Sequence, residues 1–142
     1  MLRTGARPGV SLRERLFGRV VFGVRPEEDR WEDMLQRSEA VPRLTLGDLP
    51  SPLREGLHRL AERFRPRGIR LVVFGSFARG EARPWSDLDL GYFWEGARRP
   101  EGEAELFRAV GELPTIRRIE LVDLGAAREA FRSEAAREGV PL

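Results

Sequence analysis

From residue 51 onward, apolar residues follow patterns typical of helices and strands in alternation. A first helix is predicted to begin at Ser51, a good N-cap residue, with Pro52 in its first turn. Pro66 and Gly68 are expected to end it. Its apolar positions fall at i, i+4, i+7, i+8 and i+11, which predicts one buried face made of Leu53, Leu57, Leu60, Ala61 and Phe64.

Three strands are predicted after this helix. The apolar, β-branched run at 69–74 is typical of a strand buried on both faces. Residues 75–86 are polar and contain glycine, so they form a loop with a short helical turn after Ser76. Further strands are expected at 88–94 and 116–124. Strands and helices interleaved in this way predict an α/β (α+β) fold, with one mixed β-sheet flanked by helices.

Two further helices are predicted between and after these strands, at 101–113 and 126–138. In the first, the glutamates are expected to point outward, and the inward residues to be Ala104, Phe107 and Val110. In the second, one apolar face contains Ala127, Ala130, Phe131 and Ala135. Gly139 stands where a left-handed C-cap is expected.

The first fifty residues are predicted to be a helical extension of unknown role, followed by one domain at 51–142. Ser11 to Glu14 matches a capping box, and apolar residues follow at helical spacing (Leu12, Leu16, Phe17, Val20 and Val21). A short strand at Val20–Val24 is the alternative. A second helix is expected from Pro26, with Trp31, Met34 and Leu35 on its apolar edge. Residues 40–49 are interpreted as a connector.

Composition limits the chemistry. The chain has no cysteine and one histidine, His58, which lies off the apolar stripe of its helix and is expected at the surface. A metal would therefore be held by oxygen ligands, which favours Mg²⁺. All 25 positive residues are arginine, and asparagine is absent, as suits a GC-rich genome and a thermophile. Net charge is only +2, so a surface of mixed sign is favoured over a patch that binds nucleic acid.

No apolar stretch approaches the roughly 20 residues that a membrane helix needs. Arginines at 13, 15 and 19 interrupt the first apolar segment, so a secretory signal is not expected either. We therefore expect a cytoplasmic protein.

Two aspartates within the second predicted strand are candidate metal ligands. Asp87 and Asp89 are alternate residues, so they share one face with their Cα atoms roughly 6.5–7 Å apart. Carboxylates at that spacing can converge on a pair of divalent cations, which lie roughly 3.5–4 Å apart in two-metal sites. Leu88 and Leu90 point into the core. Taken alone, the pair is also compatible with an exposed strand face carrying two solvated acids.

A glycine-serine pair at the end of the first predicted strand suggests a phosphate site. Gly75 would allow the backbone to approach a phosphate closely, and the hydroxyl of Ser76 can donate to it. Gly80 offers a second close approach, and Arg79 is a charge partner for phosphate. A simple strand-to-helix turn would use the same residues. The fixed separation of ten residues between Gly75-Ser76 and Asp87-x-Asp89 is more specific than either part.

The stretch VVFGSFARGEARPWSDLDLGYF resembles the signature of the polymerase-β-type nucleotidyltransferase superfamily. Within it, GSFARGEARPWSDLDL is most similar to the minimal nucleotidyltransferases (MNT), small proteins often paired with HEPN-domain partners. The resemblance extends from about Leu53 through RIELVDL to FRSEAAREGVPL and leaves out residues 1–50. It implies the polymerase-β-like nucleotidyltransferase fold.

The resemblance also implies roles for particular residues. Gly75 and Ser76 would contact the triphosphate, with Arg79, Gly80 and Ser86 as further candidate nucleotide-binding residues. Asp87 and Asp89 would bind two Mg²⁺ ions. The third carboxylate matches Glu120, where the family usually has aspartate; Asp123 is nearby but falls on the opposite face of its strand. Trp85 is another departure, because polar residues are more common there.

The implied activity is transfer of AMP from ATP to a hydroxyl acceptor, with Mg²⁺ as cofactor. In MNT–HEPN pairs the acceptor is a tyrosine of the HEPN toxin, and the MNT protein is the antitoxin. One alternative is a non-catalytic module of the same fold that neutralises its partner by contact. Another is an enzyme that modifies a small molecule. Nucleic acid is not expected as the direct substrate.

Overall fold

The computed structural model describes residues 11–16, 19–23 and 41–142, and these form a six-stranded sheet covered by helices. The strands are β1 (Ser11–Leu16), β2 (Arg19–Phe22), β3 (Ile69–Phe74), β4 (Leu88–Trp94), β5 (Ile119–Asp123) and β6 (Val140–Pro141). The helices are α2 (Ser51–Phe64), α3 (Ser76–Arg79), α4 (Pro100–Gly111) and α5 (Glu129–Glu138), with short 3₁₀ turns η1 (Leu46–Asp48) and η2 (Arg65–Arg67).

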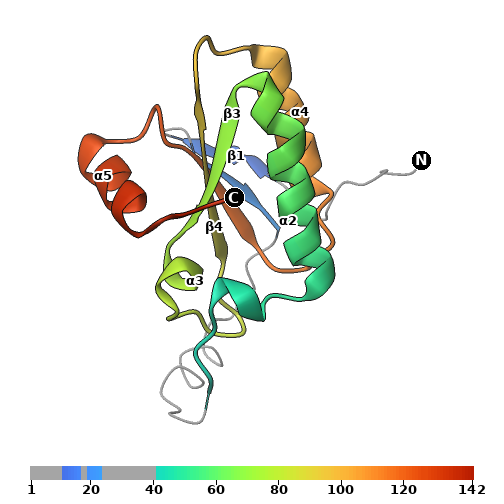
Figure 1. Ribbon diagram of the computed structural model, residues 1–142, viewed down its shortest axis with the longest axis vertical. Helices are drawn as coiled ribbons and strands as arrows, with labels where there is room; N and C mark the ends of the chain where they lie inside the picture. The colour runs from blue at the N-terminus through green and yellow to red at the C-terminus, as the bar shows by residue number, and fades with distance from the viewer. Residues whose placement is uncertain (1–10, 17–18, 24–40) are drawn as a thin grey trace.

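The sheet is mixed, which confirms the predicted α+β fold. Its strand order is β1-β2-β5-β4-β3-β6. The central pair β4 and β5 is parallel, and the other neighbouring strands are antiparallel. Helices α2 and α4 cover one face of the sheet and α5 lies on the other, with α3 at the end where β3 finishes (Figure 1).

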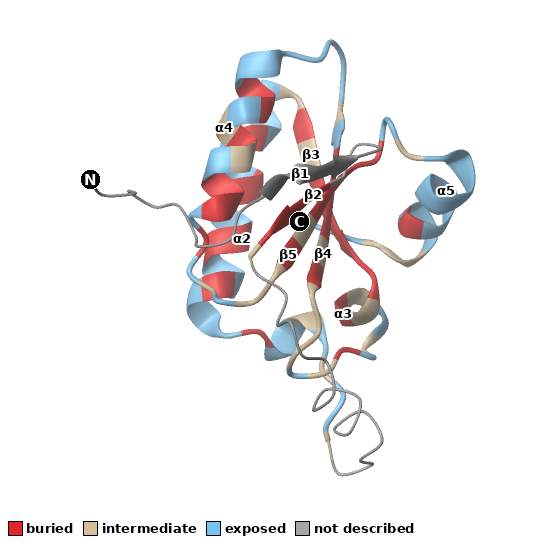
Figure 2. Cartoon of the chain, turned by 180° about the vertical axis from the view of Figure 1, so that it is seen from behind, coloured by how far each residue is buried: buried red, intermediate tan, exposed pale blue. Residues whose placement is uncertain are grey.

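The two faces of the sheet are unequally covered. The face toward α2 and α4 contains the main core, in which side chains of α2, α4 and all four central strands pack together; its fully buried members include Leu53, Leu57, Phe64, Leu88, Leu90, Leu106, Ile119 and Leu121. The α5 face has a smaller cluster of Val72, Phe74, Val122, Leu124 and Ala135. Most of α5 is exposed (Figure 2). Polar residues of this second face can therefore reach solvent.

Helix α2 follows the prediction closely. It begins at Ser51, but Pro50 is its N-cap residue, so Ser51 lies inside the first turn rather than capping it. All five residues of the predicted apolar stripe are buried. The 3₁₀ turn at 65–67 and the left-handed Gly68 end the helix where the sequence indicated. Residues 41–50 form the expected connector, which pairs with the later loop through an isolated bridge between Leu44 and Ala82.

The later helices differ from the prediction in detail. In α4 the buried face contains Leu106, Ala109 and Val110, while Ala104 is exposed. Glu103 points inward and is buried, because Tyr92 and Arg98 provide polar partners there. After α5, Gly139 is extended rather than left-handed, since the chain continues directly into β6 alongside β3.

The N-terminal segment differs most. Residues 11–16 and 19–22 form two strands, not the helix predicted from the Ser11–Glu14 capping box; the strand alternative near Val20 was correct. β2 pairs with β5, and Val20 and Phe22 are buried toward α4. Residues 19–22 include two valines, which favour a strand, and they gain burial and backbone hydrogen bonds to β5 in that conformation. The sheet thus includes chain on both sides of residue 50. That domain boundary remains a prediction, and the helix expected from Pro26 lies outside the described residues.

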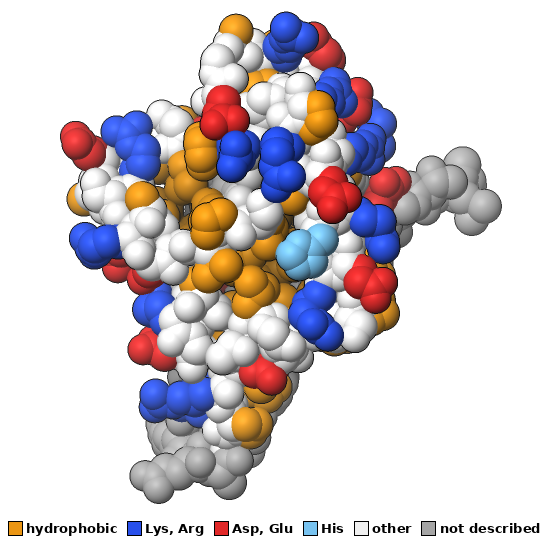
Figure 3. Space-filling view, in the orientation of Figure 1, with side chains coloured by type: hydrophobic (Ala, Val, Ile, Leu, Met, Phe, Trp, Pro, Cys, Tyr) orange, Lys and Arg blue, Asp and Glu red, His pale blue; other side chains and the backbone are white. Residues whose placement is uncertain are grey.

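Within the described residues, no helix is both long and apolar enough to cross a bilayer. Positive and negative side chains are interspersed over the face shown in Figure 3, around an apolar area. This distribution agrees with the mixed-sign surface expected from the small net charge.

Candidate nucleotide and metal site

Two of the predicted site carboxylates lie side by side on the central strands. Asp89 of β4 is the register partner of Glu120 of β5. Residues in register on parallel strands project from the same face, and neighbouring strands are about 4.8 Å apart. Both side chains lie on the α5 face and are half-buried. On its other side Glu120 faces Val21 of β2, which is 2% exposed. The register therefore brings the two acids together from positions 31 residues apart in the sequence.

Asp87 directly precedes β4 and is held by an arginine. Its Oδ2 accepts a hydrogen bond from Nη1 of Arg118 at 2.9 Å. The Arg118 side chain is only 12% exposed, and that of Asp87 is 27% exposed. Arg118 precedes β5 and stands two residues before Glu120. A guanidinium thus contributes positive charge at the end of the strands where the predicted carboxylates lie.

Gly75 joins the turn that is predicted to bind phosphate to one of these carboxylates. It ends β3 with φ 75° and ψ −153°, a conformation that residues with a side chain rarely adopt. A Cβ at this position would overlap Oδ2 of Asp89 and lie 2.9 Å from its Cγ. Only glycine allows the backbone to pack directly on the Asp89 carboxylate. The structure therefore brings together the two halves of the sequence motif.

The residues that follow Gly75 form the single turn α3. Ser76 begins it and is half-buried, and the left-handed Gly80 ends it beside the connector, near Thr45. Arg79 donates from Nε to Glu81 and from Nη1 to Glu138, each at 3.0 Å. Its pKa is raised, first by the hydrogen bond to Glu81 and also by Glu138. Arg79 is thus positioned at the turn by two carboxylates.

Ser86 has a local structural partner. Its Oγ accepts a hydrogen bond from the backbone N–H of Arg83 at 2.7 Å, which closes the turn that contains Trp85. Arg117 holds the same loop from the other side, donating to the carbonyls of Pro84 and Ser86 at 2.9 and 2.7 Å. The Arg117 guanidinium lies 4.9 Å from the ring centre of Phe77, and burial lowers its pKa. These contacts fix the loop that leads into Asp87.

Sequence reasoning missed Arg118 and Glu138 as members of this region. Arg118 could have been found from the alternation that selected Glu120, because two residues earlier on a strand means the same face. Glu138 could not, because it comes to Gly75 from the end of α5. It accepts from the Gly75 N–H at 3.4 Å.

The side chains fit Mg²⁺ in chemical type and in the face they share. Asp87, Asp89 and Glu120 offer carboxylate oxygens, the ligands that this ion prefers. In the described part of the chain, however, no three Asp, Glu, His or Cys side chains are gathered closely enough to hold an ion. The Asp87 carboxylate would have to exchange Arg118 for a metal. The donor set is compatible with a cation in chemical type.

Asp123 lies on the opposite face of β5, as strand alternation predicted. It is 3% exposed and forms an ion pair with Arg98. Arg98 also donates to Glu103 at 2.7 Å, and Glu103 accepts from the Tyr92 hydroxyl at 2.7 Å. We call Asp123, Arg98, Glu103 and Tyr92 the buried tie. It joins β4, β5 and α4, and its contacts are those of a structural network.

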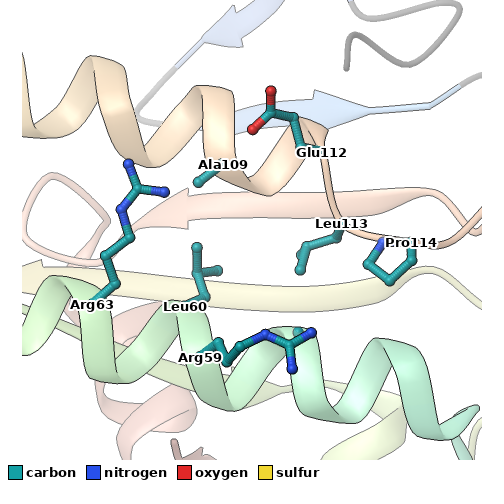
Figure 4. A pocket seen from close by; sticks show the side chains of 8 residues that line it. Arg59, Leu60, Arg63, Ala109, Glu112, Leu113 and Pro114 are labelled. Carbon is teal, nitrogen blue, oxygen red and sulfur yellow. The ribbon is translucent and has the colours of Figure 1, made fainter. Parts of the chain in front are cut away.

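A pocket of about 340 Å³ lies between α2 and α4. Figure 4 shows Arg59 and Arg63 of α2 on one side and Glu112, Leu113 and Pro114 at the end of α4 on the other. This pocket belongs to the helical layer, on the other side of the sheet from Asp89 and Glu120. It is therefore separate from the candidate site.

Comparison with known proteins agrees with this geometry. Residues 61–142 match the family described as "Polymerase beta, Nucleotidyltransferase". The chain is also similar to a solved structure described as "Structure of putative minimal nucleotidyltransferase", with 34% identity and a TM-score of 0.52 over 63% of this chain and 92% of that one. No curated protein matches the chain. The chain belongs to the polymerase-β-type nucleotidyltransferase superfamily, among its minimal nucleotidyltransferases.

Proposed function

We propose that this protein transfers AMP from ATP to a hydroxyl group in a Mg²⁺-dependent reaction, and that the acceptor is a tyrosine of a HEPN toxin partner. The observation that carries the proposal is the packing of Gly75 on Asp89, with Asp89 in register with Glu120. A backbone turn suited to phosphate and a carboxylate pair suited to Mg²⁺ meet at one point. Family membership supports the reaction class, and the resemblance to MNT proteins supports the partner.

In this proposal the triphosphate lies along the turn that begins at Gly75. Gly75 and Gly80 allow close approach, and Ser76, Arg79 and Ser86 supply donors and positive charge. Asp87, Asp89 and Glu120 hold Mg²⁺, which would neutralise phosphate charge and help to activate the acceptor hydroxyl. Arg118, which holds Asp87 here, would have to release it to such an ion, and its positive charge would then be available to the phosphates.

The transfer itself exchanges one bond to phosphorus for another. The acceptor oxygen bonds to the α-phosphorus of ATP, and the bond from that phosphorus to the bridging oxygen of pyrophosphate breaks. The hydroxyl proton passes to a carboxylate of the set, and pyrophosphate leaves. We assign this role to Asp89 and Glu120, which lie side by side and half-buried, and His58 on the exposed side of α2 is not required.

The test is labelling of a HEPN partner with ATP that carries ³²P at the α-position, in the presence of Mg²⁺. The purified protein should label the partner, and Asp87→Asn and Asp89→Asn should abolish the label. Glu62→Gln, which removes one carboxylate from the exposed side of α2, should label normally. A folded wild-type protein that leaves every co-purified partner unlabelled would argue strongly against the proposal.

The second candidate is a non-catalytic module that neutralises its partner by contact. It is favoured by the ion pair between Arg118 and Asp87 and by the ungathered carboxylates. Calorimetry separates the two proposals. The contact module should bind no ATP·Mg²⁺ and should inhibit its partner fully as Asp89→Asn. The transferase should bind ATP·Mg²⁺ and lose partner inhibition in that variant.

A further inference from the structure

We propose that Glu138 belongs to the nucleotide site, where its carboxylate occupies the place of a nucleotide phosphate until the nucleotide displaces it. This inference rests on the proposed function, since it assumes that a phosphate binds at the Gly75 turn. It adds a residue that sets the affinity of the site and that the sequence motif does not contain.

The contacts of Glu138 are those of an anion bound at the turn. A single oxygen, Oε1, accepts from the Gly75 backbone N–H at 3.4 Å and from Arg79 Nη1 at 3.0 Å. The donors are one backbone amide and one guanidinium, the combination that recognises phosphate oxygens. The carboxylate side chain is only 21% exposed, so it lies against the turn rather than in open solvent.

The fold brings Glu138 to this position. It is the last residue of α5, and the helix packs on the sheet through buried Ala135 and through Phe131, whose ring meets that of Phe74 edge-on at 5.5 Å between centres. Directly after it, Gly139 packs so closely on β3 that a Cβ would lie 2.6 Å from Cγ2 of Val72. β6 then pairs with β3. The backbone of Glu138 is therefore held on both sides, and its side chain is left to reach the turn.

Because both are negatively charged, the Glu138 carboxylate and a nucleotide phosphate compete for the donors at the Gly75 turn. A carboxylate and a phosphate cannot share the same two donors, and their like charges repel at this distance. Arg79 is also held by Glu81 at 3.0 Å, so it keeps its position when Glu138 leaves. In this proposal the Glu138 side chain rotates away from Gly75 when a ligand enters. The cost of releasing that charged hydrogen bond lowers the apparent affinity for phosphate.

The experiment compares the affinity of wild type, Glu138→Gln and Glu134→Gln for ATP·Mg²⁺ and for inorganic triphosphate by calorimetry. Glu138→Gln removes the negative charge that competes with phosphate. This variant should therefore bind both ligands about tenfold more tightly than wild type. Glu134 is exposed one turn earlier on the same helix, so Glu134→Gln makes the same change in net charge and should stay within about twofold of wild type. Glu81→Gln frees Arg79 but not the Gly75 N–H, and its effect should be smaller than that of Glu138→Gln.

The outcomes separate this inference from the proposed function. Equal affinities of wild type and Glu138→Gln, with both proteins binding ATP·Mg²⁺, would overturn the role of Glu138 and leave the nucleotide site standing. Failure of both proteins to bind either ligand would overturn the nucleotide site and this inference together. Binding only by Glu138→Gln would support it most strongly. Thermal melts of each variant without ligand confirm that the compared proteins are folded.

Discussion

Glu120 and Asp123 are three residues apart on β5 and have opposite surroundings. Glu120 lies half-buried on the α5 face beside Asp89, with Asp87 and Arg118 at the same end of the sheet. Asp123 is 3% exposed on the other face, inside the buried tie. Its Oδ1 also accepts from the backbone N–H groups of Gly125 and Ala126 at 3.0 and 3.3 Å. A single strand thus carries one acid that we propose for chemistry and one that belongs to a structural network.

The difference shows which property of a carboxylate indicates function. The more buried acid is the less suited to catalysis, because its partners are protein groups that fold with it. Arg98 has a raised pKa, chiefly through its hydrogen bond to Asp123, so the tie keeps its positive charge. Asp89 and Glu120, the acids of the proposed site, instead lie side by side and half-buried on the α5 face.

The sharpest test of this comparison makes the same chemical change at both positions. Glu120→Gln should reduce AMP transfer by about a thousandfold, since several kcal/mol of metal-dependent stabilisation are lost at about 1.4 kcal/mol per factor of ten. Its stability should change little. Asp123→Asn should leave the rate unchanged but lower the free energy of unfolding by about 1.5–3 kcal/mol, because a buried charge-assisted hydrogen bond is lost. Urea unfolding and the labelling assay measure the two effects, and exchanged outcomes would reverse the assignment of the two acids.

The two arginines provide a second test. Arg98→Met leaves Asp123 and Glu103 without their shared cation and should cost about 2–3 kcal/mol of stability, less than for a fully buried pair because Arg98 is 45% exposed. Mg²⁺ should not restore this loss. Arg118→Met instead exposes Asp87 to a metal, so Mg²⁺ at ten times its dissociation constant should stabilise that variant by about 1.4 kcal/mol.

The control for the arginine pair is wild type, in which Arg118 competes with the metal for Asp87. Its melting temperature should rise less with Mg²⁺ than that of Arg118→Met at equal concentration. Equal rises in the two proteins would mean that Arg118 does not oppose the ion. A rise in Arg98→Met that exceeds the rise in wild type would place a cation in the buried tie and break the comparison.

The smallest expected effect is a shift in the titration of Tyr92, the single tyrosine of the chain. Burial raises its pKa above the ordinary value of 10.0, and the hydrogen bond to Glu103 raises it further. The folded state therefore holds this proton more tightly, so the associated stability is full below pH 10 and is lost as pH rises above it. Absorbance of tyrosinate should appear together with loss of helical circular dichroism. If tyrosinate formed while the protein was still folded, Tyr92 would not be held in the buried tie as described.

Most elements after residue 51 could be predicted because their patterns are local. The apolar stripe of α2 reflects a helix buried on one face. The continuous apolar residues of β3 and the alternating residues of β4 and β5 likewise reflect which faces of each strand are buried. Alternation also separated Glu120 from Asp123 correctly. Contacts between distant segments could not be predicted in this way. Glu103 is buried because of Tyr92 and Arg98, and Gly139 is extended because β6 joins β3.

The N-terminal strands show the same limit more strongly. Ser11 to Glu14 fits a helix cap, and the apolar spacing that follows suits a helix, yet β2 pairs with the edge of β5 and β1 pairs in turn with β2. Val20 and Phe22 of β2 are also buried in the main core. Tertiary pairing overrides local propensity there. The motif on which the site prediction rests, Gly75-Ser76 and Asp87-x-Asp89, is local in the sequence, and its function stays a prediction. Its electrostatic partners Arg118 and Glu138 depend on how β5 and α5 are placed.

The pairing of β2 with β5 has a consequence for the order of folding. Val21 and Glu120 are partners about a hundred residues apart in the chain, whereas β3 and β4 are neighbours in sequence. Contacts of long sequence separation form slowly, because the intervening chain loses much of its freedom when they close. During synthesis β2 leaves the ribosome long before β5 does, and until then its only neighbour among the described strands is β1. The pairing of β2 beside Glu120 therefore forms only after β5 has been made, and the side-by-side arrangement of Asp89 and Glu120 cannot form before then either.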